Sequence, residues 1–166
     1  MARWAYILTT FFALAAWAGA QGPVPAPTLT PADQLRLLKA NGTLIDNLVD
    51  HGVALSGKDR IEERAEQCRN AGKALANAIH DAAGKQDAER VAELTNLFSN
   101  VVRDGLLPTL EDGKRTVTPE SPAGKKLREV RGTATDDVTA LKATIPATAK
   151  TKDSLKQLDE LAEKLK

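Results

Sequence analysis

The chain has 166 residues and a formal net charge of +1, with 23 basic and 22 acidic side chains. A charge so nearly balanced argues against a general nucleic-acid binder, because phosphate contacts need a basic surface. The single cysteine excludes a disulfide-stapled scaffold and a four-cysteine zinc site.

Residues 1–20 have the pattern of a secretory signal peptide. Arg3 gives a basic start, an apolar run extends from Trp4 to Trp17, and residues 18–20 read Ala-Gly-Ala, a small-x-small pattern that signal peptidase cleaves. An uncleaved membrane anchor is the alternative interpretation, since about 17 apolar residues nearly span a bilayer. We expect a periplasmic or secreted protein with no stable membrane insertion after cleavage.

Residues 21–30 are predicted to form a proline-rich linker, because prolines at positions 23, 25 and 27 favour extended backbone over helix. The first helix is predicted over 31–55, with Thr30 as its cap and Pro31 at its first position. Apolar or small residues at helical spacing predict its buried stripe: Leu38, Asn41, Ile45, Leu48, Gly52 and Leu55.

The second helix is predicted over 58–83, with Cys68 on its apolar stripe and Gly84 as its C-terminal cap. The third is predicted over 87–112. A kink or short break is expected near 105–108 in that helix, because Pro108 lacks a backbone donor and clashes with the preceding turn.

The last two helices are predicted over 122–145 and 151–166, separated by Pro146. Nowhere does a convincing alternating β-branched run occur. The sequence therefore predicts an all-α fold in which residues 31–166 form a single domain. Its architecture would be an antiparallel helical bundle or long helical hairpins of four to five amphipathic helices.

Three side chains are candidate soft or imidazole metal ligands: His51, His80 and Cys68. Neither histidine has a strong ligand three or four positions away, and the two would lie about 25 Å apart along a helical hairpin. No C-x-x-C-H haem attachment sequence occurs. We therefore predict no metal site and no cofactor.

Cys68 is interpreted as a small buried residue, since it shares a stripe with Ile61, Ala65 and Leu75. An intermolecular disulfide and a reactive nucleophile are the two alternatives.

No motif of a hydrolase, a metalloprotease or a nucleotide-binding loop occurs, so the protein is predicted not to be an enzyme and to have no catalytic residue. Acidic residues are dense at the start of the second helix (Asp59, Glu62, Glu63 and Glu66), but interleaved basic residues indicate a solvated helix face. A carboxylate site is the alternative.

A basic segment spans residues 114–131 and carries six cations against two acids: Lys114, Arg115, Lys125, Lys126, Arg128 and Arg131. Such a segment could meet an anionic partner, or it could be a charged loop and helix start with no ligand.

The features together favour an exported, non-enzymatic helical protein that acts as a protein–protein interaction or structural module of the cell envelope. Its expected partner is another protein or a second copy of itself, and nucleic acid is not expected. The alternative is a periplasmic ligand- or metal-responsive sensor or carrier bundle, motivated by Cys68 and the two histidines.

Overall fold

The computed structural model describes residues 30–166, and for 33, 34, 36–38 and 40 it describes the backbone alone. The predicted signal peptide and nearly all of the predicted linker lie outside the described residues. Within residues 30–166 the secondary structure is helical, with no strand, which confirms the all-α prediction. Packing separates the chain into two units, Met1–Ala40 and Asn41–Lys166.

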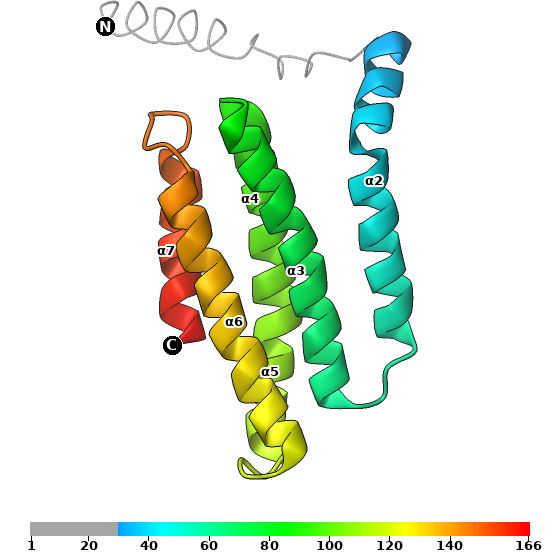
Figure 1. Ribbon diagram of the computed structural model, residues 1–166, viewed down its shortest axis with the longest axis vertical. Coiled ribbons are helices and arrows are strands. Elements are labelled where there is room, and N and C mark those ends of the chain that lie inside the picture. The colour runs from blue at the N-terminus through cyan, green and yellow to red at the C-terminus, as the bar shows by residue number, and fades with distance from the viewer. Residues whose placement is uncertain (1–29) are drawn as a thin grey trace, which may run out of the picture. The chain divides into compact units, whose positions relative to one another are not determined.

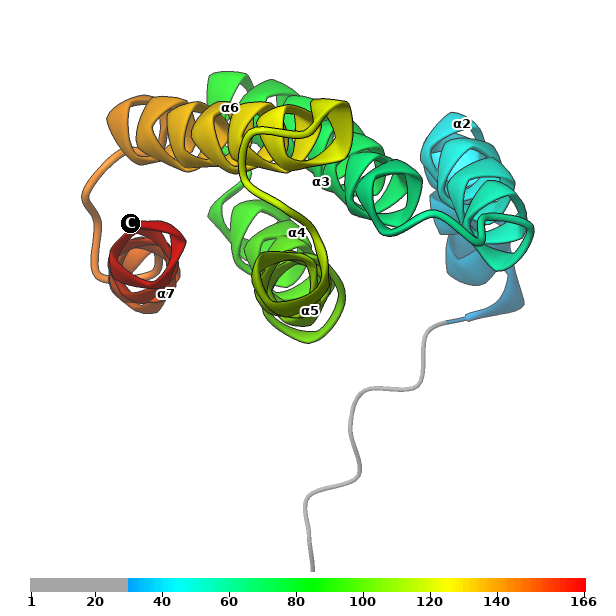
Figure 2. The same cartoon turned by 90° about the horizontal axis from the view of Figure 1, so that it is seen from below.

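Four antiparallel rods form a bundle in the larger unit (Figure 1). They are α3 (Ile61–Gly84), a continuous rod of α4 (Ala88–Asn100), η1 (Val101–Leu106) and α5 (Leu107–Thr116), then α6 (Pro122–Thr144) and α7 (Lys152–Leu165). α3 packs against α4 and α6, and α7 packs against the same two helices. Seen from below, α3 and α6 form one layer, and α4 and α7 form the other (Figure 2).

A further helix, α2 (Pro31–Ser56), crosses the boundary between the two units. Its residues from Asn41 onward are joined to the bundle by two side-chain hydrogen bonds. Asn41 Oδ1 accepts from an Arg90 guanidinium nitrogen at 2.5 Å, and His51 Nδ1 lies 3.3 Å from Gln67 Oε1. None of the described side chains of α2 is buried, so this helix adds little to the core.

Local sequence explains where α4 and α6 begin and end. The Asp87 carboxylate accepts from the Arg90 amide at 3.0 Å, and the Ser121 hydroxyl accepts from the Gly124 amide at 3.1 Å. Each contact satisfies an amide that has no partner inside its own helix. Ile145 is extended and precedes Pro146, which fits the end of α6 at Thr144.

The C-terminal cap of α3 differs from the prediction. Gly84 does not adopt a left-handed backbone, and the residue that does is Gln86, with φ of 57°. The Gln86 amide donates to the Ala83 carbonyl and the Asp87 amide to the Ala82 carbonyl, which closes the helix end around Gln86. The reversal comes two residues later than Gly84, directly before Asp87, which caps α4.

Of the kink or short break expected near 105–108, the short break does not occur, because the third rod continues through Pro108. The backbone passes through the π-helical segment η1, in which the Leu107 amide donates to the Val102 carbonyl five residues earlier. The Thr109 hydroxyl donates to the Gly105 carbonyl at 2.8 Å just beyond it. The wider turn accommodates the missing proline donor, so the rod continues to Thr116 rather than ending near 112.

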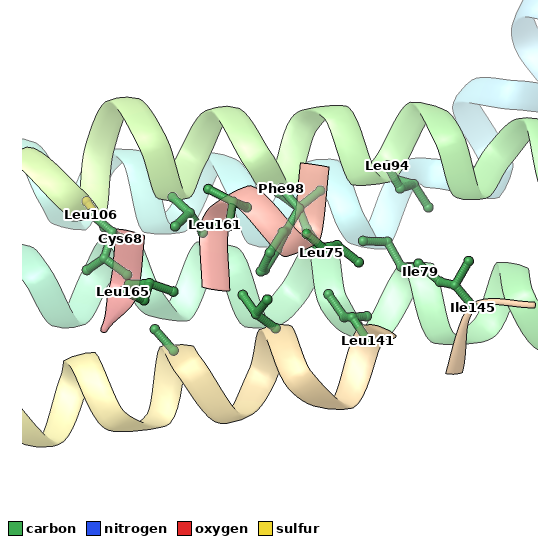
Figure 3. Packing of buried hydrophobic residues seen from close by; sticks show 14 of the residues in the cluster. Cys68, Leu75, Ile79, Leu94, Phe98, Leu106, Leu141, Ile145, Leu161 and Leu165 are labelled. Carbon is green, nitrogen blue, oxygen red and sulfur yellow. The ribbon is translucent and has the colours of Figure 1, made fainter. Parts of the chain in front are cut away.

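The core lies along the central axis of the four rods (Figure 3). Leu75 and Ile79 of α3 face Leu94 and Phe98 of α4, and all four are at most 2% exposed. A β-carbon at Gly72 would lie 3.6 Å from the Phe98 ring, an ordinary van der Waals distance, so α3 and α4 approach closely there. Because aromatic residues are so few, this close approach of aliphatic faces supplies most of the apolar burial.

Candidate functional site

The two histidines lie far apart on the larger unit. His51 of α2 contacts Gln67 in the first half of α3. His80 is exposed and lies 13 residues after Gln67 on α3, roughly 20 Å from it. Among the residues described, no group of three or more His, Cys, Asp and Glu side chains is arranged to hold a metal ion. The contact of His51 is therefore structural, because it holds α2 to α3.

Cys68 is buried at 6% exposure, which confirms its interpretation as a small core residue. Burial raises the pKa of its thiol, and the nearby Arg64 charge opposes this only in part. A β-carbon at Gly105 in η1 would lie 3.4 Å from the cysteine sulfur. The thiol is thus protonated and covered by η1, neither of which suits a nucleophile or an intermolecular disulfide.

The acidic residues at the start of α3 are paired with cations rather than gathered into a carboxylate site. Glu62 is buried and contacts Arg60, and Glu63 lies 3.3 Å from Lys58. Glu66 contacts Lys126 of α6 at 3.1 Å, and this hydrogen bond raises the pKa of the lysine. The pairs with Arg60 and Lys58 hold the residues before α3 against its first turn, and the pair with Lys126 joins α3 to α6.

The basic segment divides into three groups in the structure. Lys126 faces α3, and Arg115 and Lys125 are exposed. The remaining three cations line one pocket between α5, α6 and the loop that joins them: Lys114, Arg128 and Arg131. The sequence located the basic segment but could not separate these three from the others.

The pocket has a volume of about 290 Å³ and combines apolar walls with this basic rim. Its apolar walls come from Leu110 of α5, Leu127 of α6, and Val117 and Pro119 of the joining loop. The joining loop is held in place, since the Val117 amide donates to the Gly113 carbonyl at 2.9 Å and the Ser121 hydroxyl donates to the Thr118 carbonyl at 2.6 Å. The loop part of the lining is therefore fixed by one backbone and one side-chain hydrogen bond.

The rim carries more positive than negative charge. One oxygen of Glu111 accepts from Lys114 at 2.9 Å and from Arg131 at 3.0 Å. These hydrogen bonds, the one from Lys114 above all, hold the pKa of the Glu111 carboxyl below its ordinary value. Arg128 lies 3.6 Å from Glu120. Because a single carboxylate faces two cations, this corner of the rim keeps an excess positive charge.

Two glycines shape the pocket, and sequence reasoning missed both. A β-carbon at Gly113 would lie 2.5 Å from Leu127 Cδ1, and one at Gly124 would lie 2.4 Å from the Thr118 carbonyl oxygen. The lack of a side chain at these positions lets α5, α6 and their loop approach closely. The available signal was one glycine directly after the helix predicted over 87–112 and another in the first turn of the helix predicted over 122–145.

The second candidate surface is an apolar stripe on α2. Leu44, Leu48 and Leu55 are half-buried against the bundle, but Ile45, Val49 and Val53 are 40%, 57% and 68% exposed. At 100° per residue, these exposed side chains, here called the outer stripe, lie roughly 120° around the helix from the half-buried leucines. The predicted stripe is therefore wrong in placing Ile45 with Leu48 and Leu55 on one buried face, since α2 is apolar on two sides.

Comparison of the chain with known proteins gives no match. No protein-family model, no curated protein and no solved structure matches the chain. In residues 30–166, no helix has the length and apolar character needed to cross a membrane. The pocket between α5 and α6 and the outer stripe of α2 are therefore the features that indicate a function.

Proposed function

We propose that the protein is an exported, non-enzymatic module of the cell envelope that acts through helix–helix association. The outer stripe of α2 carries this proposal, because three large apolar side chains at four-residue spacing face solvent on a helix that only loosely joins its own bundle. A contiguous apolar surface of this kind is typical of an interaction site. Export is supported by the leader pattern of residues 1–20.

A second copy of this chain is the partner that the stripe fits best. If two α2 helices pack antiparallel about a two-fold axis at Val49, Val49 meets its own copy and Ile45 meets Val53 of the other helix. The stripe is thus self-complementary. Gly42 and Gly52 flank it, and a β-carbon at either position would meet nothing within 4 Å, which leaves room for a second helix to approach.

The exposed area sets the strength of this association. Full burial of a large aliphatic side chain contributes about 1.5–3 kcal/mol. Scaled by the exposed fractions of Ile45, Val49 and Val53 in two copies, the gain is about 5–10 kcal/mol. Association costs about 4–15 kcal/mol in lost freedom of motion. The expected dimer is therefore weak and depends on protein concentration.

Sedimentation equilibrium over a range of concentrations tests the proposal with two matched variants of α2. Val49→Asp places a charge at the centre of the stripe and should shift the protein to monomer. Asn47→Asp adds the same side chain at an exposed position roughly 160° around the helix, so dimerisation should not change. Circular dichroism checks that both variants remain helical.

Three outcomes would overturn self-association through the stripe. The first is a wild-type protein that is monomeric at every concentration. The second is equal dimerisation of wild type and Val49→Asp. The third is stripe-dependent crosslinking to a different envelope protein, without crosslinking between copies.

A ligand-responsive carrier is the second candidate function, and the specific observation in its favour is the pocket between α5 and α6. The metal-responsive version has no such support in the described residues, where no three-ligand cluster is found.

A further inference from the structure

We propose that the pocket between α5 and α6 binds a single-chain carboxylate of about eight carbons, with the chain between the apolar walls and the carboxylate at the basic rim. This inference deepens the carrier candidate by naming its ligand class, and it does not depend on the outer stripe of α2.

The volume sets the size of the ligand. A volume of about 290 Å³ lies at the lower end of the roughly 300–1,000 Å³ typical of small-molecule sites, so the pocket suits a ligand of on the order of ten non-hydrogen atoms. Octanoate, with eight carbons and two oxygens, has that number. A much longer chain would extend past the walls into solvent, and a much shorter one would leave apolar surface uncovered.

The walls favour an apolar chain. Leu110 of α5 and Leu127 of α6 are both buried and line the pocket, so the chain would contact aliphatic side chains from two helices. One backbone polar group of each pocket glycine already has a hydrogen-bond partner, since the Gly113 carbonyl accepts from Val117 and the Gly124 amide donates to Ser121. These two groups are therefore not free to bind a polar chain.

The rim favours an anion. The pocket lining includes three cations and no carboxylate. Arg131 is the best placed of the three, because its side chain is only 18% exposed and its guanidinium is already held by Glu111 at 3.0 Å. A carboxylate has the geometry to accept two parallel hydrogen bonds from a guanidinium. Lys114 also donates to Glu111, at 2.9 Å, and has further ammonium donors with which to add a third contact.

Nuclear magnetic resonance of the uniformly ¹⁵N-labelled full chain tests the proposal at residue level. The amides of Gly113 and Gly124 report on the pocket, and those of Gly72 and Gly84 on α3 serve as internal references. Titration with octanoate should shift the two pocket amides in a saturable way, with a dissociation constant below about 1 mM. Octanol and acetate, which carry the chain alone and the anion alone, should each bind about tenfold or more weakly.

Three variants sharpen the test. Arg131→Gln should weaken octanoate binding about tenfold or more, because it removes a charge-assisted hydrogen bond. Lys125→Gln is the matched control, since it removes a charge from an exposed position of the same basic segment outside the pocket. Val117→Trp should abolish binding by filling the cavity at a loop position whose extended backbone accepts a large side chain.

The proposal would be overturned by the absence of saturable shifts at Gly113 and Gly124, by octanol binding as tightly as octanoate, or by equal losses in Arg131→Gln and Lys125→Gln. Because these readouts concern the pocket amides and not the oligomeric state, failure here leaves the dimer test unaffected.

Discussion

Substitution of glycine by alanine at two positions of α6 should change stability in opposite directions. At Gly124, the new β-carbon would lie 2.4 Å from the Thr118 carbonyl oxygen, 2.6 Å from the Pro119 carbonyl oxygen and 2.9 Å from the Pro119 carbonyl carbon. At Gly132 in the same helix, the new β-carbon would meet nothing within 4 Å. The two variants therefore contain the same chemical change in one helix and differ in their surroundings.

The magnitudes follow from these contacts. All three atoms around Gly124 belong to backbone, so they cannot move aside as a side-chain end can, and an overpacked site of this kind costs about 1–3 kcal/mol. Gly124→Ala should lower the free energy of unfolding by about 2–3 kcal/mol. Gly132→Ala removes a helix-interior glycine, so it should raise the free energy of unfolding by about 0.5–1 kcal/mol.

Urea denaturation followed by circular dichroism measures both changes. With a slope of about 2 kcal/mol per molar urea, the unfolding midpoint should fall by about 1–1.5 M for Gly124→Ala and rise by about 0.3–0.5 M for Gly132→Ala. Gly113→Ala is an intermediate case, because its clash is with the movable end of the Leu127 side chain at 2.5 Å. It should cost only about 1 kcal/mol.

The reasoning would be refuted if Gly124→Ala were as stable as the wild type, or if Gly124→Ala and Gly132→Ala shifted the midpoint in the same direction by similar amounts. Either result would mean that the close approach of the α5–α6 loop to α6 is absent in solution.

Three further substitutions test other features of the fold. Gln86→Gly should raise the free energy of unfolding by about 1 kcal/mol in a thermal melt, because φ of 57° strains a residue with a β-carbon; a lower stability would contradict the left-handed cap. Thr95→Val should also stabilise, by about 1 kcal/mol, since the Thr95 hydroxyl is fully buried and has no hydrogen-bond partner in the described structure. Destabilisation would indicate that the hydroxyl is bonded. Because burial raises the pKa of the Cys68 thiol, the unfolded chain loses this proton first as pH rises, so the wild type should lose stability above about pH 9. Below that pH the Cys68 thiol does not change the free energy of unfolding, and above it Cys68→Ala should lose less stability than the wild type. Equal profiles of stability against pH for the two proteins would contradict the argument.

The positions of the helices could largely be predicted from the sequence. Apolar residues recur at three- and four-residue spacing, which only a helix brings to one face, and this period covers each rod of the bundle. The signals at the ends of α6 are equally local: Ser121 caps the amide of Gly124 three residues later, and Pro146 prevents continuation. The burial of Cys68 also followed from its place on a stripe.

The candidate sites could be predicted only in part. The sequence marked the basic segment, but it could not show that Lys114 on α5 and Arg131 on α6 would share Glu111 beside an apolar cavity. Their 17-residue separation carries no information about distance until α5 and α6 are packed together. Gly113 and Gly124 were similarly hidden, because their role depends on what approaches them from another segment.

For α2, the sequence determined that apolar residues recur at helical spacing on two sides of the helix, and the tertiary structure decided which side is covered. Leu48 lies against the bundle, while Val49, its neighbour in the chain, faces solvent. Helical periodicity specifies which residues share a face, since that depends only on the 3.6-residue turn. Which face is buried depends on the neighbours that distant parts of the chain provide, and those neighbours exist only once the bundle has folded.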